Sequence, residues 1–143
     1  MTMEEAERFP FVMVNPDLGP SHALPYMPIV LEYRQRQITV IGLVDSGSTL
    51  NVLPYGLGLE LGLVWDKQSI SVPLTGNLKD SEASAIILMG RVGGFAPVRL
   101  AFAWTRNERV PLILGQANFF MEFDVCLFRS RWAFEVRPKS MQG

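Results

Sequence analysis

The sequence contains a single cysteine, Cys126, and a single histidine, His22. One cysteine excludes an intrachain disulfide and any zinc site built from cysteines. His22 has no potential metal ligands around it in a Pro-rich segment, so we expect a solvated loop residue. Cys126 lies in an apolar run and is expected to be a small buried hydrophobe. We therefore expect no metal ion and no organic cofactor.

Charge is also scarce. Asp, Glu, Lys and Arg make up 19% of the 143 residues, against about 25% in typical proteins, and the formal net charge is −1. Without an excess of Lys and Arg to neutralise phosphates, we expect no nucleic acid partner. No apolar run approaches the length of a transmembrane helix. Glutamates stand where a secretory signal would need a basic start and an apolar centre, so we expect a cytoplasmic protein without membrane association.

The sequence is rich in short apolar runs and in turn residues. Hydrophobic residues make up 48%, and there are 12 glycines and 10 prolines. This length suits one domain, and short β-branched runs between turns predict an all-β fold. We expect an N-terminal arm or strand with a Pro-rich loop over 1–27, the folded domain over 28–137 and a tail over 138–143. Strands are predicted at 29–33, 37–44, 50–53, 68–74, 82–89, 98–104, 110–114, 125–128 and 132–136, a short helix at 116–121, and a helical turn or irregular segment at 55–63.

The segment Asp45-Ser46-Gly47-Ser48 stands between two nearly continuous apolar runs. An exposed Asp-Ser-Gly turn is the simplest interpretation, but such a turn is usually flanked by alternating polar and apolar residues. A carboxylate avoids an apolar environment unless it is compensated. The small residues that follow allow a tight loop whose N–H and hydroxyl groups face the carboxylate.

A second apolar run, Val110-Pro111-Leu112-Ile113-Leu114-Gly115, precedes the predicted short helix, and Gly115 follows Asp45 by 70 residues. Together the two segments resemble those of the retropepsin-like aspartic proteases, over roughly 28–136. The resemblance implies a small closed β-barrel of the acid-protease type with one short helix near the C-terminus. The later apolar strand would cross behind the catalytic loop.

By this resemblance Asp45 is the catalytic carboxylate. Ser46 takes the position of the family's Thr or Ser, whose hydroxyl ties the two catalytic loops together. Gly47 lets the backbone pass close to the substrate, and its carbonyl would bind the substrate main chain. Leu114 and Gly115 would pack under the Asp45 loop.

The sequence departs from the retroviral enzymes at two linked positions. Thr49 and Gln116 replace an Asp and an Arg that pair in those enzymes, so a neutral hydrogen bond could take the place of the ion pair. Ser48 follows the Asp-Ser-Gly, as in pepsin-like enzymes. If its hydroxyl donates to the Asp45 carboxylate, it favours the ionised form, which predicts an acidic activity optimum.

Aspartic proteolysis needs two carboxylates about 3 Å apart that share one proton. No other aspartate of this chain precedes a Ser-Gly or Thr-Gly pair, so the second carboxylate must be Asp45 of another copy related by a two-fold axis. We expect a homodimer and an inactive monomer. The resemblance suggests dimer contacts in the end segments 9–14 and 125–136, unless these only fill the core; the apolar candidates are Phe128, Trp132 and Phe134.

A flap that closes over the substrate is expected within 72–86, with its tip near residues 76–78. An ordinary hairpin loop is the alternative. The candidate substrate-binding residues of the flap are Leu74, Gly76, Asn77 and Leu78.

These expectations predict an aspartic endopeptidase that hydrolyses a peptide or protein substrate with water activated between two Asp45 carboxylates. One alternative is a catalytically inactive barrel of the same type that acts as a peptide-binding or dimerisation module. Another is an unrelated ligand-binding β-barrel in which the Asp-Ser-Gly arose by chance.

Overall fold

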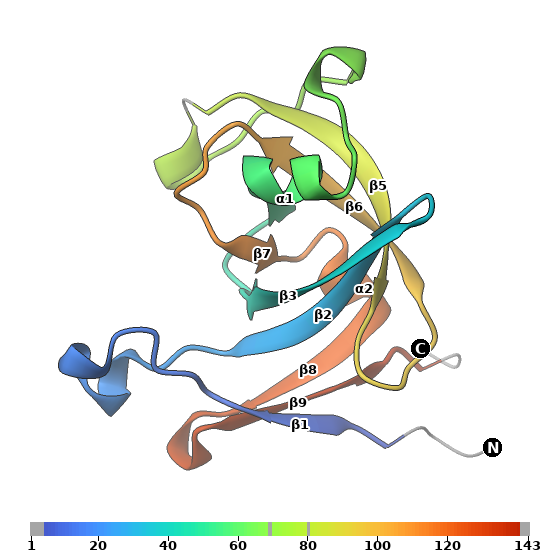
Figure 1. Ribbon diagram of the computed structural model, residues 1–143. Helices are drawn as coiled ribbons and strands as arrows, with labels where there is room; N and C mark the ends of the chain where they lie inside the picture. Colours follow the sequence, from blue (N-terminus) through green and yellow to red (C-terminus); the bar gives the residue numbers. More distant parts are fainter. Residues whose placement is uncertain (1–4, 69, 80, 141–143) are drawn as a thin grey trace.

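The computed structural model describes residues 5–68, 70–79 and 81–140, and the side chain of Asn77 also lies outside this description. Six strands form a closed barrel and three more form a separate sheet beside it (Figure 1). The all-β closed barrel predicted from the sequence is confirmed, with the predicted short helix near the C-terminus. In spatial order the barrel strands are β2 (Tyr26–Tyr33), β3 (Arg36–Val44), β7 (Leu112–Leu114), β4 (Asn51–Leu53), β6 (Val98–Thr105) and β5 (Ala83–Arg91).

Two long antiparallel hairpins supply most of the barrel wall. In the first, β2 pairs with β3 from Tyr26↔Leu43 to Tyr33↔Arg36, and Arg34 adopts φ 55° in the tight turn. This is the predicted hairpin, with its turn where the polar residues interrupt the apolar runs. In the second, β5 pairs with β6 from Ala83↔Thr105 to Gly90↔Val98.

Two three-residue strands form the crossing at the centre of the barrel. Strand β7 runs parallel to β3 and meets β4 through Val52↔Ile113, so it lies between the strands that precede and follow Asp45. Strand β4 also runs parallel to β6 and is buried at all three residues. Burial is why these segments are mostly apolar rather than alternating.

The core fills the barrel with large side chains. Trp104 is fully buried; Tyr55 of helix α1 (Tyr55–Glu60) stacks on it with ring centroids 5.6 Å apart. Gly58 of the same helix provides the space, because a Cβ there would overlap the Trp104 indole. A smaller apolar cluster contains Leu74, Ala83 and Ala103.

The separate sheet consists of β1 (Glu7–Pro10), β9 (Ala133–Pro138) and β8 (Phe123–Phe128), with β9 in the middle. Phe134 is fully buried, and Phe9 stacks on it at 5.4 Å. The expectation of a buried Cys126 is wrong, because its side chain is exposed. Cys126 is paired with Glu135 on the face of the sheet opposite the buried Phe134.

Two sequence predictions need correction. Segment 68–74 is not a strand: its only ladder contact in the described part is the single bridge between Ser71 and Ser84, and Pro73 has no N–H to continue a ladder. Residue 69 lies outside the described residues. The helix predicted at 116–121 is α2 (Phe119–Glu122), because the N–H groups of Gln116 and Ala117 donate to the carbonyls of Ser48 and Thr49 instead.

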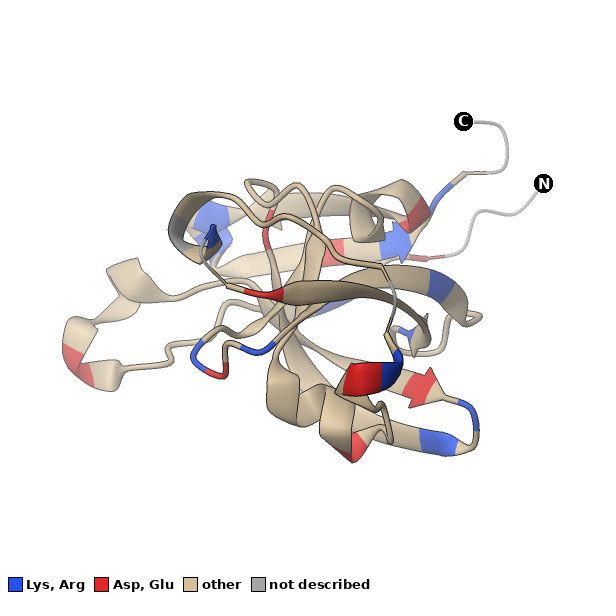
Figure 2. Ribbon diagram, turned by 90° about the horizontal axis from the view of Figure 1, so that it is seen from above, with Lys and Arg blue, Asp and Glu red and all other residues tan. Residues whose placement is uncertain are grey.

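Residues 11–25, hereafter the arm, connect β1 to β2 and project from the body of the molecule (Figures 1 and 2). The arm contains two 3-10 turns, η1 (Pro16–Leu18) and η2 (Pro20–His22), and a bridge between Val12 and Leu24 closes its base. The 3-10 turns η3 (Trp65–Lys67), η4 (Gly76–Leu78) and η5 (Arg129–Arg131) lie elsewhere in the chain. Among the described helices, none is long and apolar enough to cross a membrane.

Candidate active site

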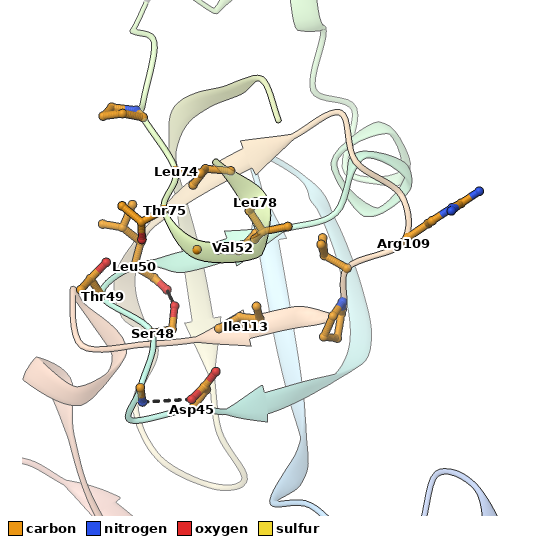
Figure 3. A pocket seen from close by; sticks show the side chains of 15 residues that line it. Asp45, Ser48, Thr49, Leu50, Val52, Leu74, Thr75, Leu78, Arg109 and Ile113 are labelled. Carbon is orange, nitrogen blue, oxygen red and sulfur yellow. Dashed lines mark hydrogen bonds between the residues drawn. The ribbon is translucent and has the colours of Figure 1, made fainter. Parts of the chain in front are cut away.

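Asp45 directly follows β3 and begins a tight turn. Its backbone N–H donates to the carbonyl of Leu114 at 3.0 Å, and its carbonyl accepts from the Ser48 N–H at 3.1 Å. The Gly47 N–H donates to Oδ1 of the Asp45 carboxylate at 2.9 Å (Figure 3). The carboxylate is partly exposed, so it is held in a fixed orientation while it stays accessible to a substrate.

Ser48 supports the loop in a different way from the one expected. Its hydroxyl donates to the carbonyl of Leu50 at 2.7 Å. A hydroxyl has one proton to donate, so in this arrangement Ser48 does not donate to the Asp45 carboxylate. The expectation of an acidic optimum caused by Ser48 therefore loses its structural premise, and Ser48 is assigned to the shape of the loop.

Leu114 and Gly115 lie directly beneath the Asp45 loop, where the resemblance placed them. The Leu114 carbonyl holds the Asp45 N–H, and a Cβ on Gly115 would lie 2.7 Å from the carbonyl oxygen of Ser48. Such a contact is far inside van der Waals range, so the backbone of the loop could not keep this position over any residue but glycine.

Asn51 holds the crossing together and was missed by sequence reasoning. Its side chain is fully buried. Its Oδ1 accepts from the Gly115 N–H at 2.7 Å, and its Nδ2 donates to the Ala101 carbonyl and to Oδ1 of Asn118. Asn118 continues the network to β6, where its Oδ1 accepts from the Ala101 N–H. The available signal was an Asn in the middle of an apolar strand, which burial permits only when the amide is hydrogen-bonded.

Gln116 links the two loops from the outside. Its Nε2 donates to the carbonyl of Ser46 at 2.7 Å. The position that carries Arg in the retroviral enzymes thus makes a neutral hydrogen bond here, as the substitution pattern suggested. The acceptor is the backbone of the catalytic loop, not the side chain of Thr49.

A cavity of about 470 Å³ opens beside Asp45. Its floor is the Asp45 loop and the crossing (residues 45–51 and 112–118), and its roof is the segment 72–79. Leu74, Gly76 and Leu78, three of the four flap candidates, line the roof (Figure 3). The side chain of the fourth, Asn77, lies outside the described residues. The remaining lining residues are Gly47, Ser48, Thr49, Leu50, Val52, Pro73, Thr75, Arg109, Val110, Pro111 and Ile113.

The described lining is mostly apolar and has one residue of each charge, Asp45 and Arg109. The two do not form an ion pair in the described structure: Asp45 faces Ile113 at one end of the cavity, while Arg109 extends away from it at the other (Figure 3). No three His, Cys, Asp or Glu side chains come together as metal ligands within the described ranges. The site therefore offers one partly exposed carboxylate at the edge of a mostly apolar cavity.

No family model matches the sequence, and no curated protein matches it. Among solved structures, the chain is similar to a retropepsin-like aspartic protease from Rickettsia conorii. The TM-score is 0.59 at 13% identity, with 95% of this chain and 96% of that one covered. At this identity the similarity concerns the fold, and the chain has a retropepsin-like fold over nearly its whole length.

Proposed function

We propose that this chain is an aspartic endopeptidase that acts as a homodimer, with Asp45 of each copy forming the catalytic pair. One observation carries the proposal: the Asp45 carboxylate, oriented by the Gly47 N–H, lies at the edge of the 470 Å³ cavity in a retropepsin-like barrel. The fold supplies the context that a bare Asp-Ser-Gly triplet lacks.

The second copy is required by the chemistry. Asp45 is the only carboxylate among the described residues that line the cavity. Two carboxylates about 3 Å apart can share one proton because both cannot be ionised at that distance. A two-fold axis beside the Asp45 turn would bring the second carboxylate to this position.

In the proposed reaction the ionised carboxylate accepts a proton from a water molecule, which attacks the scissile carbonyl carbon. The protonated carboxylate donates a hydrogen bond to the carbonyl oxygen, on which charge develops. The carbon–nitrogen bond then breaks, and the carboxyl that took the proton from water passes it to the leaving amine. The Gly47 carbonyl would bind the substrate main chain, and the Ser46 hydroxyls would join the two loops across the axis. The substrate would lie extended between Ile113 of the floor and Leu74 and Leu78 of the roof.

The test is the substitution Asp45→Asn, which keeps the size of the side chain and removes its negative charge. We expect cleavage of an unfolded protein substrate to fall by roughly 10²–10⁴-fold, with the sedimentation coefficient unchanged. Asp66→Asn is the matched control, because Asp66 is exposed on η3 outside the cavity lining, and it should keep full activity.

Two results would count against the proposal. If the Asp45→Asn variant cleaved as fast as the unmodified protein, Asp45 would not be the catalytic residue. If a strictly monomeric protein cleaved the substrate, the reaction would not need a pair of Asp45 carboxylates from two copies. If the unmodified protein binds peptides but cleaves none between about pH 3 and 7, a range that brackets the upper pKa of about 4.7 known for one aspartic pair, the inactive peptide-binding barrel would be the better description.

A further inference from the structure

The arm exposes an unusual number of apolar side chains. Of the thirteen exposed large hydrophobic residues in the described chain, five lie in the arm, with 39% to 65% of their surface exposed. Figure 2 shows charged residues distributed over the barrel and the sheet, whereas Asp17 is the single acidic residue of the arm and the arm has no Lys or Arg. An exposed segment rich in apolar side chains and poor in charge is typical of the centre of a protein interface. The five residues are Val12, Met13, Val14, Leu18 and Leu24.

The arm is held in place by Arg129, a residue of η5 at the end of the separate sheet. The Arg129 guanidinium lies 4.3 Å from the ring centroid of Trp132 and 5.3 Å from that of Phe11. The same group donates to the carbonyl of Ser21 in the arm at 2.8 Å. These contacts order the arm before any partner binds, which reduces the entropy cost of association.

The base of the arm lies beside the catalytic turn. The carbonyl of Pro25 accepts from the N–H of Val44 at 3.0 Å, and Val44 immediately precedes Asp45. Next to this point, the outer face of the β2–β3 hairpin shows Ile41, 56% exposed, paired with the exposed Pro28. Exposed apolar residues therefore lie in the arm and at Ile41, four residues before Asp45.

Two of the three apolar anchors expected at the chain ends are covered within the same chain, and the third, Trp132, is 41% exposed with the Arg129 guanidinium over its ring. Phe134, expected as a dimer anchor, is fully buried in its own core and covered by Phe9. Phe128 is partly buried under the guanidinium of Arg8 at 5.3 Å. A stable interface buries about 800 Å² on each partner, which the short Asp45 turn does not supply alone. The exposed apolar surface adjoining the turn lies in the arm and at Ile41.

We propose that the arm is the dimerisation element of this chain. The arms of two copies, together with Ile41, would pack across a two-fold axis that passes beside the two Asp45 turns. This inference rests on the proposed function, because the partner is identified as a second copy by the missing second carboxylate. The arm's near absence of charge suits such a self-complementary contact, in which a charged residue near the two-fold axis would come close to its own copy.

The test introduces a charge into the arm and the same charge elsewhere. Val14→Asp places a carboxylate on a side chain that is 65% exposed, and Val64→Asp does the same after α1, at a valine that is 47% exposed. By sedimentation equilibrium, we expect Val14→Asp to raise the dimer Kd at least tenfold, and Val64→Asp to leave it within about twofold. Circular dichroism and thermal melting confirm that both variants fold.

A second pair of variants tests Arg129, which holds the arm in place, and leaves the exposed apolar side chains of the arm unchanged. Arg129→Ala should also weaken the dimer, because the arm loses the contacts that Ser21 and Phe11 make with the guanidinium. Arg131→Ala is its control, since Arg131 is a neighbouring exposed residue that lies over Phe128 instead. The cleavage activity of the arm variants should recover as their concentration is raised, because their Asp45 loops are intact.

Separate outcomes distinguish this inference from the proposed function. If neither Val14→Asp nor Arg129→Ala changes the Kd of the dimer, the arm is not the dimerisation element, even if Asp45→Asn abolishes cleavage. If the arm variants lose the dimer but the unmodified protein cleaves no substrate, the arm is supported as the dimerisation element and the proposed endopeptidase activity is overturned. A wild-type protein that stays monomeric at all concentrations overturns the arm inference.

Discussion

The floor and the roof of the cavity are built in opposite ways. In the floor, the Asp45 turn is hydrogen-bonded to Leu114, and the buried amide of Asn51 holds Gly115 from below. The described backbone that leads into the roof meets the barrel at the Ser71–Ser84 bridge, through the hydrogen bonds from the Val72 N–H to the Ala83 carbonyl and from the Ala85 N–H to the Ile70 carbonyl. Within the roof, Leu74 provides the main buried apolar contact. The floor is therefore fixed by several hydrogen bonds, whereas the described part of the roof has few contacts with the barrel.

This difference suits the two tasks of the proposed enzyme. Chemistry needs the carboxylate within a fraction of an ångström of its productive position, which requires a rigid support. Substrate entry needs a segment that can move away and return, and such segments come from the least stable part of a fold. The comparison predicts that small changes in the floor cost more than equal changes in the roof.

The largest effect is expected for Asn51→Ala, which removes the amide at the centre of the floor. The Gly115 N–H would lose its acceptor in a buried position, and an unsatisfied buried group costs about 1–3 kcal/mol. With the lost donor bonds added, we expect the free energy of unfolding in urea to fall by about 2–4 kcal/mol. Asn107→Ala, which removes an acceptor for the Arg109 N–H in a partly exposed turn, should cost about 1 kcal/mol. Equal losses would contradict the role given to the buried Asn51 amide in the floor.

A pair of Gly→Ala substitutions compares floor and roof with the same added methyl group. At Gly115 the methyl meets backbone oxygens of the Asp45 loop, so we expect a loss of about 2 kcal/mol and a fall in kcat of up to about 10²-fold. At Gly76 nothing lies within 4 Å, although φ is +64°, so backbone strain of about 1 kcal/mol is the main cost. Stability is measured by urea unfolding at one protein concentration, because a dimer's stability depends on it. A larger fall in kcat at Gly76 would place the rigid element in the roof.

The smallest effect is expected for Gln116→Ala. This change removes the bond from Nε2 to the Ser46 carbonyl at an exposed position, where a net contribution of about 0.5–1 kcal/mol is ordinary. We expect a similar loss of stability in the urea experiment and a change of a few-fold in kcat. A loss as large as that of Asn51→Ala would show that the outer link, not the buried amide, holds the floor.

Much of the barrel could be predicted because its signals are local. The β2–β3 hairpin follows from two β-branched runs with a polar turn between them. The crossing followed from a resemblance carried by two short motifs. The prediction failed for 68–74, which looks like a strand by composition but has Pro73 within it and lies over the cavity. It failed for Cys126 because the apolarity of a run does not say which face of an edge strand meets the core.

The sequence by itself determined the fold class and singled out the candidate carboxylate, because these depend on residue types and their order along the chain. Only the tertiary structure decided that Asn51 supports the loop, that Ser48 donates to Leu50 and that the arm is left exposed. Those facts depend on which groups from distant segments meet. Hydrogen bonds and burial depend on these contacts between distant segments, and the order of residues along the chain does not reveal which segments come into contact.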